Sequence, residues 1–249
     1  MNRFYVDANF EFCPVLRDRD EIDHIRKVLR YRKGDKVEIF DAKKKEYLAV
    51  IKEINRDEIL FEIETVKQKR KENSLRSTLY QGIAKGTRME FVMQKSTELG
   101  MDEIVPVRFE RCVAKLDAND KKIDRWNKIC LEAAKQSKRN SLCIVREAID
   151  FVEMVEELKK YSLVLFLYEE ETTLSLKKFL QEWRAREEKS VQRPLDIALI
   201  VGPEGGIGED EARILSREGF RSVTLGDNIL RTETVGATAM AMLQYEFSL

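Results

Sequence analysis

The sequence contains a single histidine, His24, among its 249 residues. A metal site that needs two histidines is therefore excluded, and a Ser-His-Asp or Cys-His triad is open only to His24 itself. Four cysteines are present, but no two of them have the CxxC spacing of common zinc sites, so we expect no metal centre. Any catalysis must then depend mostly on backbone groups, arginine, lysine, carboxylates or hydroxyls.

Glycine, proline and long apolar runs are also scarce. The chain has 11 Gly and 4 Pro, which excludes collagen-like and linker-like sequences. Its longest apolar runs, Leu163–Tyr168 and Ile197–Val201, are far shorter than the roughly 20 residues of a membrane-spanning helix. Hydrophobic residues make up 43% of the chain, which excludes a disordered protein. Because the N-terminal residues show no basic-then-apolar signal pattern, we expect a cytoplasmic protein with no membrane contact.

Charge is abundant and unevenly distributed. Charged residues make up 36% of the chain and balance to a net charge of zero. Residues 1–72 carry a net charge of +2, residues 73–149 a net +5 and residues 150–249 a net −7. A basic first part of this kind fits a face that binds a polyanion, and ordinary scatter over a solvated surface explains it equally well.

The first part of the chain has the pattern of β-strands. Residues 36–41, 46–54 and 58–66 carry alternating β-branched or aromatic residues, and polar turns separate them. Residues 20–29 have apolar side chains at the spacing of a short helix. These features predict a small antiparallel barrel with one helix over residues 1–72.

After a charged linker at residues 67–73, strands and helices alternate through residues 73–249. Continuous apolar runs indicate strands that are buried on both faces, which favours an α/β domain with a mainly parallel sheet. A capping box, Thr87-x-x-Glu90, is expected to start a helix that Gly100 ends. The strands are expected at 75–84, 104–109, 163–168, 197–201 and 222–225, and the other helices at 122–138, 151–160, 174–186, 209–218 and 232–247.

The densest glycine run is Gly202–Gly208 (GPEGGIG), between a predicted strand and a predicted helix. Glycines at the carboxyl end of a parallel strand let the backbone approach a ligand closely and present amide donors. The run does not match a dinucleotide-binding GxGxxG, because Glu211 stands at the third glycine position, and no Lys-Ser/Thr pair follows as in a phosphate-binding loop. A ligand site and a purely geometric role are both open.

A second loop, residues 225–234 (LGDNILRTET), leaves another predicted strand and enters the last helix. Thr232 or Thr234 is able to cap that helix, and Arg231 and Glu233 are able to form a surface ion pair of little energetic value. Two loops of this kind, at the carboxyl ends of parallel strands, are where an α/β domain places its site.

Several motifs taken together are more specific than any one of them. GPEGG follows an apolar strand, LGDNILRTET precedes the last helix, and residues 85–100 read KG-x-R-x-E … QK-x-TELG; Arg125-Trp126, Glu132-Ala133 and Gln136-Ser-x-Arg139 add to them. This set resembles the RsmE-type ribosomal RNA methyltransferases, and the resemblance covers nearly the whole chain. Enzymes of this family use S-adenosyl-L-methionine to methylate N3 of a uridine in 16S ribosomal RNA.

The resemblance implies a trefoil-knotted SPOUT methyltransferase domain over residues 73–249, preceded by a PUA-like RNA-binding barrel over residues 1–72. It also implies a homodimer packed through the knot that acts on 16S rRNA or the small ribosomal subunit. In such a knot, three loops hold the cofactor S-adenosyl-L-methionine in a bent shape. The residues expected to bind it are Leu167, Gly202, Pro203, Gly205, Leu225, Gly226, Ile229 and Leu230.

Uridine N3 is a poor nucleophile while it carries its proton, so the site must remove the proton or stabilise the developing anion. No histidine lies near the loops, and we hypothesise that Arg231 stabilises the charge on O2 or O4 of the base. Glu204 or Glu233 could accept the N3 proton or orient Arg231, and a simple turn role for Glu204 stays open. The candidate contacts to RNA phosphates are Arg3, His24, Arg26 and Arg30 in the barrel, and Lys85, Arg88, Lys95 and Arg139 in the second domain.

Two other functions are open at this point. A ribosome-assembly or RNA-binding protein would keep the fold without catalysis, but it would have no need of the intact glycine loops and the LRTET run. A nucleotide-dependent enzyme of the doubly wound type would need phosphate-binding or dinucleotide-binding motifs, which the sequence lacks. Methyl transfer is therefore the leading hypothesis.

Overall fold

The computed structural model describes residues 1–68, 74–114, 121–187 and 194–247. The chain forms two compact units: Met1–Lys71 with Ala134–Leu142, and Glu72–Ala133 with Cys143–Leu249. The sequence predicts a boundary between residues 72 and 73, but it does not predict that residues 134–142 belong to the first unit. Most of the predicted linker, residues 69–73, lies outside the described residues.

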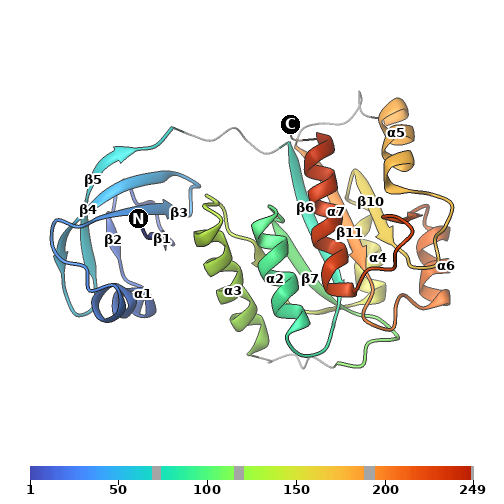
Figure 1. The fold of residues 1–249 in the computed structure, drawn as a ribbon, viewed down its shortest axis with the longest axis horizontal. Coiled ribbons are helices and arrows are strands. Elements are labelled where there is room, and N and C mark those ends of the chain that lie inside the picture. The colour runs from blue at the N-terminus through green and yellow to red at the C-terminus, as the bar shows by residue number, and fades with distance from the viewer. Residues whose placement is uncertain (69–73, 115–120, 188–193, 248–249) are drawn as a thin grey trace. The chain divides into compact units, whose positions relative to one another are not determined.

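The first unit is built on a five-stranded sheet that curves around an apolar core (Figure 1). The strand order is β1-β3-β4-β5-β2; β1 pairs in parallel with β3, and the other pairs are antiparallel. Two register shifts between β4 and β5 increase the local twist and help the sheet to curve. The strands are β1 (Arg3–Val6), β2 (Val15–Leu16), β3 (Lys36–Asp41), β4 (Glu46–Ile54) and β5 (Ile59–Val66).

One helical stretch completes the first unit. It consists of α1 (Arg19–Asp23) and a π-helix, η1 (His24–Val28), where the sequence predicts a single helix at 20–29. The side chain of Asp18 caps its start, because Asp18 Oδ1 accepts a hydrogen bond from the Glu21 N–H at 2.9 Å.

The second unit contains a seven-stranded sheet (Figure 1). Its order is β12-β10-β11-β6-β7-β8, with β9 also paired to β7, and these pairs are all parallel. This arrangement confirms the α/β fold with a mainly parallel sheet. The strands are β6 (Leu75–Gly82), β7 (Glu103–Arg108), β8 (Ile144–Val145), β9 (Ile149–Asp150), β10 (Leu163–Leu167), β11 (Leu195–Val201) and β12 (Arg221–Val223).

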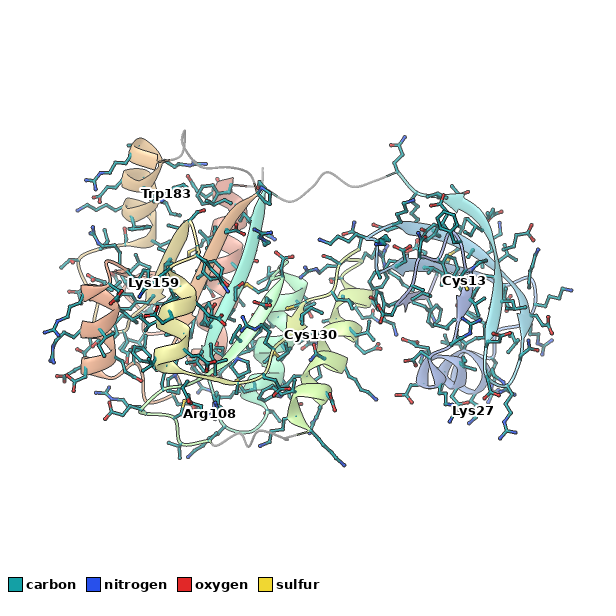
Figure 2. All side chains as sticks on the ribbon, turned by 180° about the vertical axis from the view of Figure 1, so that it is seen from behind. Cys13, Lys27, Arg108, Cys130, Lys159 and Trp183 are labelled. Atoms are coloured by element: carbon teal, nitrogen blue, oxygen red, sulfur yellow. The ribbon has the colours of Figure 1, made fainter. Side chains whose placement is uncertain are left out.

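Helices cover both faces of this sheet, because successive residues of a strand point to opposite sides. In β6, Leu79 belongs to the core on one face and Tyr80 to the core on the other. The first face is covered by α2, α3, α5 and α7, and the second by α4 and α6. Figure 2 shows Cys130 of α3 and Trp183 of α5, which are buried in the first of these cores. The helices are α2 (Arg88–Glu98), α3 (Lys122–Gln136), α4 (Phe151–Leu158), α5 (Leu176–Glu187), α6 (Glu209–Arg217) and α7 (Thr232–Phe247).

The two ends of α2 differ in how well the sequence predicts them. The capping box is wrong: within the described residues the Thr87 side chain makes no capping hydrogen bond, and Glu90 pairs with Arg125 at 2.7 Å instead. Gly100 follows the helix with a φ of 92°, a left-handed conformation that favours glycine, which confirms the predicted end.

The last helix, α7, has 16 residues and lies against the sheet. Its small residues allow close packing: a Cβ on Gly236 would lie 2.9 Å from the Leu79 side chain of β6. Among the helices of the described residues, none is long and apolar enough to span a membrane.

Candidate functional site

Three neighbouring strands of the second unit end at the same edge of the sheet. In the pairing register, Leu167 at the end of β10 lies opposite Val201 of β11 on one side and Val223 of β12 on the other. The glycine-rich loop follows β11 and the Arg/Glu loop follows β12, so the fold brings the two predicted loops together. The carboxyl ends of parallel strands are where α/β domains bind ligands.

The turn after β11 is packed too closely to admit side chains at several positions. A Cβ on Gly202 would lie 2.9 Å from the backbone of Gly206, and one on Gly82, at the end of β6, would lie 2.3 Å from the nitrogen of Pro203. Gly206 has a φ of 75°, and a Cβ there would overlap with the carboxylate of Glu169. Close packing within the protein therefore accounts for Gly202 and Gly206.

A buried polar chain joins the ends of β6 and β11 to the start of α7. The Gln81 side-chain amide donates to Thr232 Oγ1 at 2.9 Å, and Thr232 Oγ1 donates to the carbonyl of Gly202 at 2.6 Å. Gln81 and Thr232 are both buried. Thr232 therefore fixes the glycine turn to the last helix, which is more than the capping role that its position predicts.

Two predicted site carboxylates, Glu204 and Glu233, are joined by Arg88 from the first turn of α2. Arg88 Nη1 donates to Glu204 Oε1 at 3.1 Å, and Arg88 Nε lies 3.7 Å from Glu233 Oε2. Glu204 Oε1 also accepts the backbone N–H of Lys85 at 2.8 Å. Glu233 Oε2 is buried and accepts no hydrogen bond from the described residues, because its contact with Arg88 is an ion pair longer than a hydrogen bond.

Arg231 has a different environment from Arg88. Its side chain is exposed and makes no hydrogen bond or ion pair with any of the described residues. Its carbonyl accepts the N–H of Thr234 at 2.8 Å, in the first turn of α7. The surface pair with Glu233 is thus not formed, and the Arg231 guanidinium is accessible to a bound molecule.

The loop after β12 exposes apolar surface. Ile229 is 81% exposed, and Leu225 and Leu230 are half-buried. Gly226 has a φ of 149°, and a Cβ on it would meet no atom within 4 Å, so the space beside its backbone is open. Thr224 Oγ1 accepts the N–H of Gly226 at 3.3 Å and fixes the start of the loop.

Two residues outside the predicted set hold the glycine turn. Arg111, after β7, donates to the carbonyl of Gly205 at 3.2 Å. Glu211 accepts the N–H of Gly208 at 2.9 Å and that of Glu110 at 2.8 Å, and so ties the start of α6 to the loop after β7. A glutamate at the third helical residue is a sequence signal for such back-bonding. Nothing in the sequence points to Arg111.

A third carboxylate anchors the loop after β10. Glu171 accepts hydrogen bonds from Ser222 Oγ at 2.5 Å, from the Thr173 hydroxyl at 2.6 Å and from the Leu174 N–H at 3.0 Å. Burial would raise the pKa of Glu171, but these hydrogen bonds outweigh it and lower the pKa to about 2. Glu171 is therefore ionised at neutral pH and holds this loop against β12.

The thiol nearest the site is that of Cys112. Burial raises the pKa of Cys112, and the charges of Glu211 and Glu204 raise it further. The thiol therefore stays protonated at neutral pH, which argues against a nucleophilic role. In the part of the chain that the structure describes, no group of three or more His, Cys, Asp or Glu residues is arranged to hold a metal ion.

Five of the predicted RNA contacts lie in the first unit, and they divide into buried and exposed side chains. Arg3 is 6% exposed and Arg139 is 9% exposed. Arg3 pairs with Glu46 at 3.1 Å and donates to the carbonyl of Arg139 at 2.6 Å, so both arginines are integrated into the first unit. Arg139 thus belongs to that unit and not to the second domain, where the sequence places it. The exposed candidates of the first unit are His24, Arg26 and Arg30.

The other predicted RNA contacts lie in the second unit. Lys85 is exposed, and Lys95 is half-buried and pairs with Glu98 at 2.9 Å. Arg88 is part of the carboxylate cluster. Only Lys85 of the three therefore has a side chain that both faces solvent and has no acidic partner among the described residues.

The chain matches two known domain families. Residues 71–244 match the RNA methyltransferase domain family, and residues 16–64 match the RNA methyltransferase PUA domain family. The ribosomal RNA small subunit methyltransferase E of Buchnera aphidicola subsp. Schizaphis graminum is 32% identical over 252 residues, which cover 98% of this chain and 96% of that protein. The chain belongs to the ribosomal RNA small subunit methyltransferase E family.

Two further members of the ribosomal RNA small subunit methyltransferase E family match over nearly their whole length. The Bacillus subtilis member is 28% identical over 255 residues, covering 100% of this chain and 98% of its own. The crystal structure of the Neisseria gonorrhoeae member, bound to S-adenosyl methionine, is 32% identical with a TM-score of 0.81, covering 99% of this chain and 98% of that one. The family resemblance found in the motifs is therefore confirmed, as is the methyltransferase domain with a PUA-like domain before it.

Proposed function

We propose that the chain is an S-adenosyl-L-methionine-dependent methyltransferase that modifies N3 of a uridine in 16S ribosomal RNA. The observation that carries this proposal is the loop cluster at the ends of β10, β11 and β12, where Arg231 is exposed and Glu204 and Glu233 share one arginine. Full-length relatives named for the small-subunit ribosomal RNA support the substrate class. The choice of uridine N3 follows from the family resemblance.

The residues of the loop cluster fit the chemistry of S-adenosyl-L-methionine. Ile229 is exposed and Leu225 and Leu230 are half-buried, which suits an adenine ring, and the open backbone at Gly226 leaves room for it. The carboxylate of Glu204 suits a positive sulfonium. A solved relative bound to S-adenosyl methionine supports the same cofactor here. The residues that would hold it are Leu167, Gly202, Pro203, Gly205, Leu225, Gly226, Ile229 and Leu230.

The reaction needs alignment and proton removal from the protein. When bound, the cofactor supplies an electrophilic methyl group on a positively charged sulfur. Glu233 Oε2, a buried oxygen with no hydrogen bond from the described residues, has the acceptor capacity to take the N3 proton of uridine. The exposed guanidinium of Arg231 would stabilise the negative charge that develops on O2 or O4 of the base. Glu204, held by the Lys85 N–H, would be kept in place beside the cofactor.

The proposal includes the larger arrangement that the family implies. The loops at residues 167–169, 202–206 and 225–230 would form a trefoil knot, through which two copies pack as a homodimer. The parallel bridge between Ser175 and Thr224 supports close threading, since it joins the segment before α5 to the start of the loop after β12. The exposed basic residues His24, Arg26, Arg30 and Lys85 would contact RNA phosphates, and the enzyme would act in the cytoplasm on 16S rRNA or the small ribosomal subunit.

The deciding experiment is transfer of radiolabelled methyl groups from S-adenosyl-L-methionine to small ribosomal subunits that lack their native modification, followed by nucleoside analysis. We expect label in N3-methyluridine. Label in another nucleoside would overturn the proposed target. Absence of both label and cofactor binding would favour a non-catalytic RNA-binding assembly factor.

Arg231→Ala tests the main catalytic assignment within this assay. We expect kcat to fall about 10²- to 10³-fold, as for loss of one donor to a developing oxyanion, while cofactor affinity measured by calorimetry stays the same. Arg213→Ala is the control, because Arg213 is an exposed arginine of α6 that pairs with Asp210. Wild-type turnover of Arg231→Ala would remove Arg231 from the mechanism.

A further inference from the structure

Arg88 contacts both of the predicted site carboxylates, Glu204 and Glu233. We propose that Arg88 is a positioning residue, which holds Glu204 and Glu233 in place and so keeps Arg231 free to meet the substrate. This inference rests on the proposed function, and it replaces the RNA-phosphate contact that the sequence predicts for Arg88.

The two carboxylates contact two different nitrogens of the Arg88 guanidinium. Nη1 of Arg88 binds Glu204 Oε1 at 3.1 Å, while Nε faces Glu233 Oε2 at 3.7 Å. The planar fork of arginine is suited to two carboxylates at once, whereas the ammonium of lysine is a point charge on a flexible chain. Glu204 is fixed from a second side by the backbone N–H of Lys85 at 2.8 Å.

Partial burial makes the ion pairs of Arg88 with Glu204 and Glu233 stronger than an ordinary surface ion pair. The side chain of Glu233 is 14% exposed and that of Glu204 is 29% exposed, against 42% for Arg88. Two partly desolvated carboxylates near each other repel, and a cation between them removes that repulsion. Apart from Arg88, the arginine nearest to Glu233 in the sequence is Arg231, two residues earlier.

The pairing of Arg88 with both carboxylates affects the charge that Arg231 can offer to the substrate. Of the predicted catalytic residues, Glu204 and Glu233 are carboxylates and Arg231 is an arginine; Arg88 is a second arginine, in contact with both carboxylates. Because Arg88 pairs with both carboxylates, Arg231 is left without an acidic partner among the described residues. An Arg231 that paired with a carboxylate would have its charge neutralised and would stabilise a uridine anion less well.

The same contacts argue against a phosphate-binding role. An arginine that binds RNA phosphate presents its donors to solvent, as the exposed Arg26 and Arg30 do in the first unit. Two donor nitrogens of Arg88, Nη1 and Nε, instead face Glu204 and Glu233, so a phosphate would compete with two carboxylates for the same guanidinium.

The first test is Arg88→Lys, which keeps the charge but removes the fork. We expect kcat to fall about 10- to 100-fold through loss of alignment, with the KM values for cofactor and RNA changed by less than about threefold. Arg125→Lys is the matched control, since Arg125 pairs with Glu90 of the same helix α2 at 2.7 Å but lies in a more exposed pair. Wild-type kcat for Arg88→Lys would overturn the proposal.

The second test is Arg88→Gln, measured for kcat and for the salt dependence of RNA binding, with thermal unfolding to establish that the variant is folded. Loss of the cation removes the shared partner of Glu204 and Glu233, so we expect kcat to fall while the affinity for RNA and its salt dependence stay unchanged. Weaker RNA binding with a salt slope reduced by about 1 would assign Arg88 to a phosphate and overturn the proposal. Wild-type enzyme in the same assay separates this outcome from failure of the proposed function, which would show as no methyl transfer by the wild type.

Discussion

The hydroxyl of Thr232 connects three segments of the chain, and its removal is the sharpest test at the scale of a single residue. Thr232→Val keeps the shape of the side chain but leaves the Gln81 amide and the Gly202 carbonyl without this partner in a buried place. We expect the free energy of unfolding to fall by about 1–3 kcal/mol, measured by denaturant titration. Thr238→Val is the control, because among the described residues the Thr238 hydroxyl donates only to a carbonyl of its own helix, that of Thr234. Equal losses for the two variants would contradict the linking role.

Single residues also show what the sequence can and cannot predict about the site. Loop motifs are enough to single out Arg231, Glu204 and Glu233 as candidates, since chemistry depends on residue type and position in the loop. Partners are not predictable in this way: Arg88 lies more than a hundred residues before Glu204 and Glu233 in the sequence, and only the fold brings them together. Arg111 is missed for the same reason, because its bond to Gly205 spans two distant loops.

At the scale of elements, the approach of β6 to the turn after β11 depends on Gly82. A Cβ at this position would lie 2.3 Å from the nitrogen of Pro203 and 2.7 Å from the carbonyl carbon of Gly202, so backbone would have to move. We expect Gly82→Ala to lower stability by about 1–3 kcal/mol through overpacking, and to weaken cofactor binding measured by calorimetry because the glycine turn shifts. Gly219→Ala is the contrast, with a φ of 89° but no atom within 4 Å of a Cβ. It should cost about 1–2 kcal/mol through backbone strain and leave cofactor binding unchanged.

Elements with strong periodicity are predicted well, and short or context-dependent ones are not. The strand β4 and the helix α7 begin and end at the predicted residues, because long apolar or amphipathic patterns are physical requirements of burial. Strands of two to four residues such as β1 and β8 are missed, since so few residues carry no recognisable period. The predicted capping box at Thr87 is wrong because a tertiary contact replaces it. Glu90 pairs with Arg125 of α3 instead of bonding to the helix N-terminus.

At the scale of the whole molecule, the two units are not two consecutive stretches of the sequence, although composition suggests that they are. The amphipathic pattern of residues 122–138 reads as one helix of the second domain, and the structure does form α3 there. Its last residues nevertheless group with the barrel, where Lys135 pairs with Glu21 at 2.6 Å. A hydrophobic stripe identifies a helix that is buried, but it does not identify which core buries it.

The stability of the second unit should depend on pH through a half-buried network of hydrogen bonds around Glu157. Arg146 binds the Glu157 carboxylate through two nitrogens at 2.6 and 2.8 Å, and the hydroxyl of the buried Tyr80 donates to it at 2.8 Å. The Arg146 hydrogen bonds, aided by Tyr80 and opposed by burial, lower the pKa of Glu157 to about 2. An unfolded chain has a glutamate pKa of about 4.3, so the unfolded state binds the proton more readily.

The ionised Glu157 carboxylate stabilises the fold at neutral pH more than in acid. A carboxylate with a lowered pKa in the folded state stabilises the fold above about pH 5, and this contribution is lost as the pH falls towards about 2. We expect the difference in Tm between wild type and Glu157→Gln to be largest at neutral pH and to shrink through that range. Glu156→Gln is the control from the same helix, since Glu156 is 67% exposed and pairs only with Lys159 among the described residues. A Tm difference for Glu157→Gln that stays constant with pH would show that the ionised carboxylate is not what stabilises this network.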